Sequence, residues 1–298
     1  MNLDYLKTFY TTVKENSISK TAKLLHMSQP GVSFQLQTLE KELGFQLLIR
    51  SNKGVVLTEA GKIVYDYAVS LLSIQKDIDR ELNSLRTNIQ ETIVSSCTTV
   101  GSYTLPCSLY LFKRRYPNTK VILNTCNSDT VVENLVNKSC HIGIVEGKPN
   151  GIKIEYTKLA SCDLCLVCSK NICKYRTVSV DELTELPLII REKGSGSRQS
   201  LEYELQKLAI SLQQMNTVLE LTSSEAIKAA IFNGQGYAIL PELSIKHELD
   251  SGSLKKIAIE DTEFKTDYFL AYTKESPPRG SEKTFYDFIQ SSRRGFCS

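Results

Sequence analysis

The chain has 298 residues, of which 41% are hydrophobic, so it is long for one compact domain and comfortable for two domains with real cores. Its formal net charge of +3 is too small to indicate nucleic-acid binding by itself, and any such function must be argued from where particular residues lie. Apolar runs fall short of the roughly 20 residues that span a bilayer, and the N-terminus has no signal-peptide pattern, so we expect a cytoplasmic protein without a membrane partner.

Three short helices are predicted in the first 43 residues. The first has one apolar face, formed by Leu3, Leu6, Tyr10 and Val13. Ser19 can cap a second, shorter helix, and residues 26–28 form the turn that leads into the third. A short helix, a tight turn and a further helix in this order indicate a helix-turn-helix, whose second helix enters the DNA major groove.

The third helix, residues 28–43, has two faces of different character. One face is apolar and must be buried; it consists of Val32, Leu36, Leu39 and Leu43. Gln29, Ser33 and Gln37 lie together on another stripe, where uncharged side chains can hydrogen-bond to base edges without repelling phosphate. Pro30 falls in the first turn, where its missing N–H costs nothing. A solvated polar face is the alternative interpretation for any single helix.

A basic hairpin follows this helix and favours the DNA-binding interpretation. Residues 45–57 form an extended segment with a glycine-containing tip, in which Arg50 and Lys53 can contact phosphate or the minor groove. Because the helix order, the turn and the basic hairpin agree, the sequence predicts an all-α winged helix-turn-helix domain over residues 1–58.

A long helix is predicted next, from about residue 59 to Arg86. Apolar residues recur along it seven positions apart at Val64, Leu71, Ile78 and Leu85, with Ala68, Ile74 and Leu82 between them. We expect residues 59–90 to be a linker helix that pairs two chains and sets two recognition helices on successive turns of a roughly palindromic double-stranded DNA operator. The alternative is an ordinary amphipathic helix that folds onto its own domain.

These motifs together resemble the LysR-type transcriptional regulators. The resemblance rests, in order, on Ala22-x-x-Leu25, Ser28-Gln29-Pro30-x-Val32-Ser33-x-Gln35-x-x-x-Leu39-Glu40-x-x-Leu43-Gly44, Arg50 and Leu57-Thr58-x-Ala60-Gly61. It implies that residues of the third helix and the wing contact DNA, namely Ser28, Gln29, Pro30, Ser33, Gln35, Gln37, Arg50 and Lys53. It also implies RNA polymerase as a partner and, because family members are commonly tetramers, a homotetramer built from homodimers.

From Thr92 onward, short apolar runs alternate with helical stretches, which predicts an α/β fold with mostly parallel strands. The runs are residues 120–123, 142–145, 164–167, 186–190 and 237–240. Hydroxyl-rich segments stand at three strand-to-helix junctions, residues 93–101, 191–198 and 221–226. Each junction alone is more typical of a helix cap than of a ligand site, but three in one domain favour a small-molecule pocket.

By the resemblance, residues 91–298 are a periplasmic-binding-protein-like effector domain of two α/β subdomains joined by crossing strands. Subdomain I would comprise about residues 91–161 and 267–298, and subdomain II about residues 162–266. The effector would bind in the cleft between them, against Cys97, Thr98, Thr99, Asn127, Glu146, Ser195, Gly196, Ser197 and Thr222. Cys97 stands where relatives commonly have Ser, which leaves the identity of the effector open.

The nine cysteines and three histidines indicate neither a metal site nor a catalytic set. We expect thiols rather than disulfides in a cytosolic chain. Cys162, Cys165 and Cys168 alternate between the two faces of a predicted strand, so they cannot easily converge on one ion. Cys97 stands at a predicted helix start, which lowers the pKa of a thiol, and a redox role for it is an alternative hypothesis.

The sequence therefore predicts a ligand-responsive, sequence-specific DNA-binding transcriptional regulator that is not an enzyme and uses no cofactor besides a small-molecule effector. The hydroxyl-rich helix starts favour a small anion or carboxylate as that effector. One alternative is a cytoplasmic solute-binding protein or enzyme that uses the same α/β cleft, with N-terminal helices that only oligomerise. Another is a cysteine-based, redox-responsive regulator.

Overall fold

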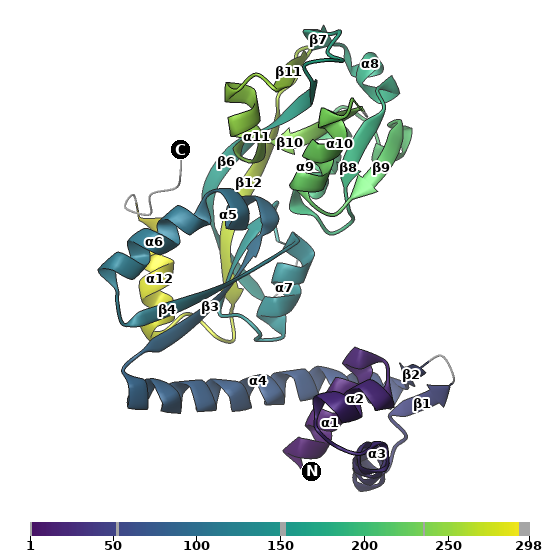
Figure 1. The fold of residues 1–298 in the computed structure, drawn as a ribbon, viewed down its shortest axis with the longest axis vertical. Coiled ribbons are helices and arrows are strands. Elements are labelled where there is room, and N and C mark those ends of the chain that lie inside the picture. Colours follow the sequence, from purple (N-terminus) through teal and green to yellow (C-terminus); the bar gives the residue numbers. More distant parts are fainter. Residues whose placement is uncertain (1, 52–53, 150–152, 235, 292–298) are drawn as a thin grey trace. The chain divides into compact units, whose positions relative to one another are not determined.

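The computed structural model describes residues 2–51, 54–149, 153–234 and 236–291, and the chain divides into two compact units between Thr87 and Asn88. The N-terminal unit is helical apart from one hairpin, whereas the C-terminal unit is built on a large sheet (Figure 1). Within the described ranges, none of the helices is both long and apolar enough to cross a membrane.

The N-terminal unit packs three helices around one small core. These are α1 (Leu3–Glu15), α2 (Ile18–Leu24) and α3 (Gln29–Leu43). The fully buried members of the core are Phe9, Ala22, Val32, Leu36, Leu39, Leu47 and Leu48, and Leu43 packs at its edge. The apolar face predicted for the third helix is therefore confirmed, and its burial directs the opposite face of α3 toward solvent.

The turn between α2 and α3 is as tight as a helix-turn-helix requires, because His26 adopts a left-handed backbone with φ of 53°. The start of α2 differs from the expectation. Ser17 rather than Ser19 is the cap: its hydroxyl accepts the backbone N–H of Lys20 at 3.3 Å. Ser17 has the extended backbone of a capping residue, whereas Ser19 already lies inside the helix.

The predicted wing is an antiparallel pair of short strands, β1 (Leu48–Ser51) and β2 (Gly54–Leu57). Asn16, the left-handed residue that ends α1, accepts the backbone N–H of Val55 through Oδ1 at 2.7 Å and so ties the hairpin to the first helix. Lys53 lies outside the described residues. The helix predicted to follow is α4 (Glu59–Thr87), with 29 residues.

The C-terminal unit is built on one mixed sheet with the strand order β4-β3-β5-β12-β6-β10-β8-β9. One half contains three parallel strands, β3 (Gln90–Cys97), β4 (Thr119–Cys126) and β5 (Ile142–Glu146). The other half contains the parallel strands β8 (Leu188–Arg191), β9 (Thr217–Leu221) and β10 (Tyr237–Pro241). All five apolar runs picked out in the sequence overlap strands of this sheet.

Two long strands connect the halves, β6 (Ile154–Ser169) and β12 (Phe264–Thr273), and they pair antiparallel along the whole length of β12. The expectation of mostly parallel strands thus holds within each half but is wrong for the centre of the sheet. The crossing strands return between the halves in opposite directions, and β10 and β5 also pair antiparallel with them. At the crossing, Ser161 pairs with Asp267 and Cys162 with Thr266.

The half with β3, β4 and β5 is termed lobe I. Its helices are α5 (Thr98–Tyr103), α6 (Leu105–Arg115), α7 (Ser128–Val136) and α12 (Gly280–Gln290). The half with β8, β9 and β10, termed lobe II, also holds α8 (Val180–Glu185), α9 (Gly196–Lys207), α10 (Ser224–Phe232), α11 (Glu242–Asp250), the small strands β7 (Thr177–Val178) and β11 (Leu254–Ile259), and the 3-10 turn Leu212–Gln214.

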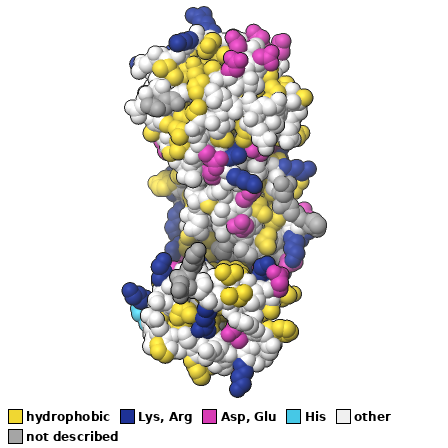
Figure 2. Space-filling view, turned by 90° about the vertical axis from the view of Figure 1, so that its right-hand side faces the viewer, with side chains coloured by type: hydrophobic (Ala, Val, Ile, Leu, Met, Phe, Trp, Pro, Cys, Tyr) yellow, Lys and Arg dark blue, Asp and Glu magenta, His cyan; other side chains and the backbone are white. Residues whose placement is uncertain are grey.

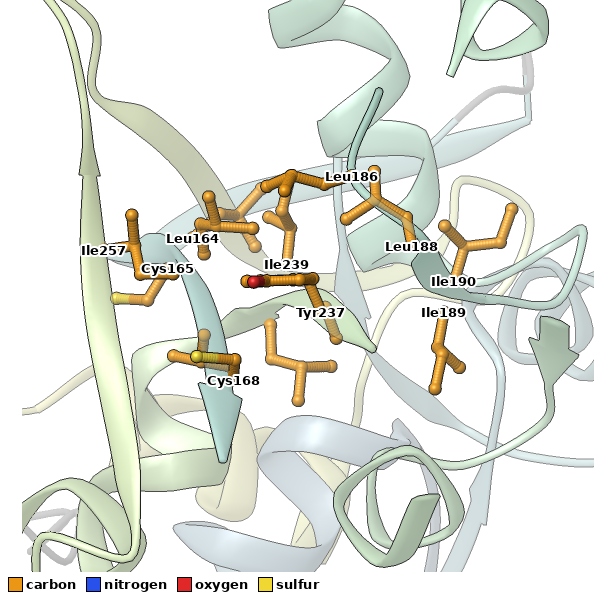
Figure 3. Close-up of a cluster of buried hydrophobic side chains, with 14 of the residues drawn as sticks. Leu164, Cys165, Cys168, Leu186, Leu188, Ile189, Ile190, Tyr237, Ile239 and Ile257 are labelled. Carbon is orange, nitrogen blue, oxygen red and sulfur yellow. The ribbon is translucent and has the colours of Figure 1, made fainter. Parts of the chain in front are cut away.

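Each lobe has a hydrophobic core of its own. In lobe II, Tyr237 and Ile239 of β10 lie between Leu164 and Cys168 of β6 on one side and Leu188 of β8 on the other (Figure 3). Two separately packed lobes joined by two strands form the kind of architecture in which small molecules bind between the parts.

Candidate nucleic-acid interface and ligand cleft

The polar stripe predicted on α3 is open to solvent at both ends. Gln29 and Gln37 are exposed, Pro30 is exposed in the first turn, and Ser33 is half-buried between them. Because burial of the opposite face fixes the rotation of α3, these side chains are held on one accessible surface. Hydrogen-bonding groups on the N-terminal half of such a helix suit contacts with base edges.

Two other predicted contact residues are engaged inside the domain. The hydroxyl of Ser28 accepts the N–H of Gly31 at 3.1 Å, as the N-cap of α3. The side-chain oxygen of Gln35 accepts the hydroxyl of Thr8 in α1 at 2.5 Å. Gln35 follows Ser33 by two positions, which is about 200° around a helix, so it faces α1 instead of the exposed stripe.

The wing brings a cation beside this stripe. Arg50 is exposed on β1, and its Nη1 lies 3.5 Å from the hydroxyl of Ser33. A guanidinium can donate hydrogen bonds to phosphate oxygens. Because Arg50 lies next to α3, its guanidinium and the polar stripe of α3 form one continuous surface of hydrogen-bond donors and acceptors. Basic and acidic side chains are interspersed on the face of the molecule seen in Figure 2. The formal net charge of the chain is only +3, so the candidate DNA surface is defined by the placement of residues such as Arg50 and Ser33.

The long helix α4 carries an exposed apolar stripe. Its members, between 42% and 81% exposed, are Ile63, Tyr67, Ile74, Ile78, Leu82 and Leu85. Val64, which the heptad pattern included, instead packs against the core of the N-terminal unit, and Ala68 is buried. The part of the predicted seam left open therefore runs from Ile74 to Leu85, and an apolar stripe of this length marks an interaction surface.

Between the lobes, a buried arginine bridges two of the predicted junctions. Arg191, the last residue of β8, is 3% exposed, and its Nη1 donates to the hydroxyl of Thr98 in lobe I at 3.1 Å. Its Nε and Nη2 donate to the two carboxylate oxygens of Glu192 at 2.8 and 3.0 Å. The amide of Asn127, in lobe I, lies 3.5 Å from the same carboxylate.

The start of α9 approaches lobe I closely enough to require a glycine. Ser195 and Ser197 are buried, and their hydroxyls lie 3.1 Å apart. A Cβ on Gly196 would stand only 2.1 Å from the backbone oxygen of Glu146 and 2.5 Å from the hydroxyl of Ser128. Backbone of lobe II therefore rests directly on lobe I at this point.

A buried carboxyl, that of Glu146, lies beside the close contact between the lobes. Glu146 ends β5, is 2% exposed, and accepts the hydroxyl of Thr99 at 2.8 Å. Burial raises the pKa of Glu146 to about 7, although the contacts with Thr99 and Thr266 and the charge of Arg191 act to lower it. Tyr268 faces it across the β5–β12 pairing, is equally buried, and has its own pKa raised by burial.

Two of the predicted effector residues differ from the others in their surroundings. Cys97 is 2% exposed in the core of lobe I, and burial raises its pKa, so the expected thiolate character is wrong. The effect of a helix start on a thiol is small beside the loss of hydration. Thr222 is exposed, and the hydroxyl that caps α10 belongs to its neighbour Ser223.

The structure also adds residues that the sequence analysis missed. From the sequence, Arg191 is only a positive charge beside the second junction. An arginine at the end of a buried apolar strand is the sequence feature that could have indicated its role. Tyr103 was missed entirely: its hydroxyl donates to Glu225 of lobe II at 2.5 Å, and Glu225 pairs with Lys228 at 2.7 Å. A cavity of about 490 Å³ borders this second contact between the lobes.

The described cysteines are possible metal ligands by residue type. Among the described residues, no group of three or more His, Cys, Asp or Glu side chains is placed to hold a metal ion. Cys162, Cys165 and Cys168 are buried on β6 as free thiols. Cys107 is disulfide-bonded, which corrects the expectation of thiols for that residue.

Comparisons with known proteins agree with this architecture. The RuBisCO operon transcriptional regulator of Allochromatium vinosum is 26% identical over 293 residues, 98% of this chain and 96% of that protein. The structure of CbnR, a LysR family transcriptional regulator, matches with a TM-score of 0.72 at 22% identity, covering 99% of both chains. The regulatory domain of CcmR from Synechocystis PCC6803, solved with 2-PG, matches with a TM-score of 0.60 at 23% identity over 67% of this chain and 95% of that one.

Two family models match in succession. The bacterial regulatory helix-turn-helix protein, lysR family, matches residues 3–62, and the LysR substrate binding domain matches residues 92–294. The N-terminal match covers α1 to the wing, and the C-terminal match covers both lobes. The chain therefore belongs to the LysR family of ligand-responsive, DNA-binding transcriptional regulators.

Proposed function

We propose that two copies of this chain bind a roughly palindromic double-stranded DNA operator, and that a small anion in the cleft between lobes I and II changes how they bind it. The observation that carries the ligand part is Arg191, a buried cation that reaches from lobe II to Thr98 in lobe I. CbnR, whose complex with its target DNA matches this chain with a TM-score of 0.70 at 21% identity over 97% of this chain and 99% of that one, supports the DNA part.

On the DNA side, Gln29, Ser33 and Gln37 read base edges, and Pro30 lies against the groove. Arg50 and Lys53 hold the wing on phosphate. We assign Ser28 and Gln35 to a supporting role, because one caps α3 and the other joins it to α1. The DNA-binding domain is residues 1–58 in this proposal.

Pairing of two chains uses the open stripe of α4, within a linker of residues 59–90. Ile74, Ile78, Leu82 and Leu85 lie at a spacing that suits a helix–helix seam. By family likeness, dimers join into a homotetramer, RNA polymerase is the further partner, and the protein works in the cytoplasm beside its DNA. It carries out no reaction of its own.

On the ligand side, the effector domain is residues 91–298, with the subdomains meeting near residues 161 and 267. An anion there would contact Arg191, the hydroxyls of Thr98, Ser195 and Ser197, and the amide of Asn127. The helices α7 and α9 begin at this place, and their N-terminal dipoles favour negative charge. Glu146 supports Thr99 from behind, while Gly196 permits the close approach of the lobes.

A mobility-shift titration of the full chain tests the proposal, using DNA from upstream of its own gene and a scrambled duplex of equal length. We expect specific binding, and a change in the shifted pattern when inorganic phosphate, sulfate, acetate or 2-PG is added at constant ionic strength. Equal affinity for both duplexes would contradict the DNA assignment. Specific binding that no anion alters, with Arg191→Gln indistinguishable from wild type, would contradict the ligand assignment.

A further inference from the structure

The Nε–Nη2 edge of the Arg191 guanidinium is already occupied by a carboxylate of this chain, that of Glu192. Glu192 places Oε2 2.8 Å from Nε and Oε1 3.0 Å from Nη2, so both oxygens of one carboxylate engage one edge of the guanidinium. The Arg191 side chain is 2% exposed, and that of Glu192 is 15% exposed. Two parallel hydrogen bonds of this kind are how arginine binds planar oxyanions.

The remaining contacts of Arg191 are compatible with exchange of this partner. Nη1 is directed at Thr98 and does not depend on Glu192. The backbone of Glu192 is held by its N–H, which donates to the carbonyl of Leu221 at 3.1 Å, and by its carbonyl, which accepts the N–H of Ser195 at 3.2 Å. The Glu192 side chain can therefore swing away while the strand end stays in place.

We propose that Glu192 is an internal ligand, and that the effector replaces its carboxylate on the Nε–Nη2 edge of Arg191. The inference rests on the proposed anionic effector and narrows its class. The replacing group must present two oxygens at carboxylate-like spacing, as carboxylates, phosphates and sulfates do. A buried guanidinium without such a partner would be strongly disfavoured, so the site is occupied either by Glu192 or by the effector.

The exchange has a consequence for the contact between the lobes. The Glu192 carboxylate also lies beside the amide of Asn127, which caps α7 by accepting the N–H of Thr130 at 3.0 Å. When Glu192 leaves, its link to Asn127 is lost while the bond of Arg191 to Thr98 remains, and the effector replaces the lost link only if it reaches Asn127. Ligands too small to reach Asn127 would bind without restoring the link.

Competition by Glu192 lowers the apparent affinity for anions, because an anion can bind only to those molecules in which the Glu192 carboxylate has left the guanidinium of Arg191. Glu192→Gln keeps the size of the side chain but removes the charge that makes the pair strong. We expect this variant to bind inorganic phosphate, sulfate or acetate about tenfold more tightly than the wild type. Glu192→Asp keeps the charge on a shorter side chain and should fall between the two.

The experiment is a titration of the full-length protein with each of these three anions by calorimetry, at constant ionic strength. Glu220→Gln is the matched control, because Glu220 pairs with Arg198 at 2.6 Å and its loss removes the same charge without removing a partner of the Arg191 guanidinium. Arg198 contacts only the backbone carbonyl of Arg191, at 3.1 Å. The control should stay within about twofold of wild type, as expected for a charge paired elsewhere. Because the internal competitor is the same for all three anions, each should gain by a similar factor, and the anion that Glu192→Gln binds most tightly identifies the head group that the edge prefers.

Two failures are distinguishable. If wild type binds an anion and Arg191→Gln abolishes it, but neither Glu192 variant binds more tightly than Glu220→Gln, the internal-ligand inference is overturned and the anion site stands. If Arg191→Gln binds all three anions like wild type, or none of the proteins binds any of them, the proposed anionic effector is overturned as well.

Discussion

The candidate sites of the two units differ in exposure and in how far apart their residues lie in the sequence. In the N-terminal unit, Gln29 and Gln37 lie exposed on a helix whose other face is buried, so one short segment supplies both the fold and the contact surface. In the C-terminal unit, Arg191, Thr98 and Asn127 come from segments far apart in the chain and lie buried or half-buried. Substitutions of the exposed stripe residues should therefore affect recognition without changing stability, whereas substitutions of the buried residues between the lobes should affect both.

The largest expected effect concerns Glu146 and depends on pH. Its pKa is about 7 in the fold against an ordinary 4.5, so the folded state holds a proton that the unfolded chain releases between these values. The free energy of unfolding therefore falls as pH rises from about 4.5 to 7, by about 3 kcal/mol for such a shift. Glu146→Gln should remove this fall. Urea unfolding of both proteins at pH 5 and pH 8 checks it, and parallel pH profiles would contradict it.

A similar effect is expected at Gly196, where a methyl group would meet the backbone oxygen of Glu146. Gly196→Ala should destabilise the effector domain by about 3 kcal/mol, the upper end for overpacked sites, and abolish its response to anions. Gly31→Ala on α3 is the comparison from the other unit, since its Cβ would meet only side-chain atoms, the hydroxyl of Ser28 at 3.2 Å and Cε of Met27 at 3.6 Å, and no backbone atom. Thermal unfolding of both variants tests this difference. Equal losses of stability in Gly196→Ala and Gly31→Ala would contradict the prediction.

An intermediate effect is expected at Gln29. Gln29→Ala should leave thermal stability unchanged and cost about 1 to 3 kcal/mol of discrimination between operator and random DNA. Gln35→Ala is the matched glutamine, and because its side chain joins α3 to α1 it should lower stability before it lowers discrimination. Competition binding combined with thermal melts separates the two. If both variants lost stability and discrimination to the same extent, the exposure of a glutamine side chain would not distinguish a DNA contact from a structural role.

The smallest effect is expected at Arg50, which is exposed on the wing. Arg50→Ala should weaken binding to operator and random DNA alike and reduce the slope of log affinity against log salt by about one unit. Binding isotherms at several salt concentrations measure this slope. A loss confined to the operator sequence would assign Arg50 to base reading instead.

The same comparison explains what could be predicted from the sequence. Val32, Leu36 and Leu39 follow a helical period, so the buried face of α3 and the polar stripe opposite it were readable from local pattern alone. The antiparallel crossing of β6 and β12 depends on pairing across about a hundred residues, which no local pattern reports. For the same reason the pairing of Tyr268 with Glu146 was not foreseen.

Burial was the second quantity that local pattern could not supply. Cys97 does stand at a helix start, but its surroundings in the core of lobe I decide its pKa. Arg191 and Glu192 are adjacent in sequence, and only the tertiary packing around them, with Thr98 and Asn127 of lobe I beside them, makes this charged dipeptide an enclosed ion pair. The candidate residues of the N-terminal unit were thus predictable one by one, whereas those of the cleft became meaningful only as a set.

The connection of the lobes through two crossing strands limits the free energy that a ligand must supply to change the angle between them. Because each lobe keeps its own core, a change in the angle between lobes leaves both cores intact and disturbs only the contacts that join them. Hydrogen bonds that join the lobes include those of Thr98 with Arg191, Asn127 with Glu192 and Tyr103 with Glu225, and two more tie Asp129 of lobe I to Gly194 and Gln199 of lobe II. Each is worth about 1 kcal/mol net. A molecule that binds only one arrangement of the lobes, at a thousandfold excess over its dissociation constant, stabilises that arrangement by about 4 kcal/mol. This is of the same order as the hydrogen bonds between the lobes taken together, so a single bound ligand can change the angle between the lobes.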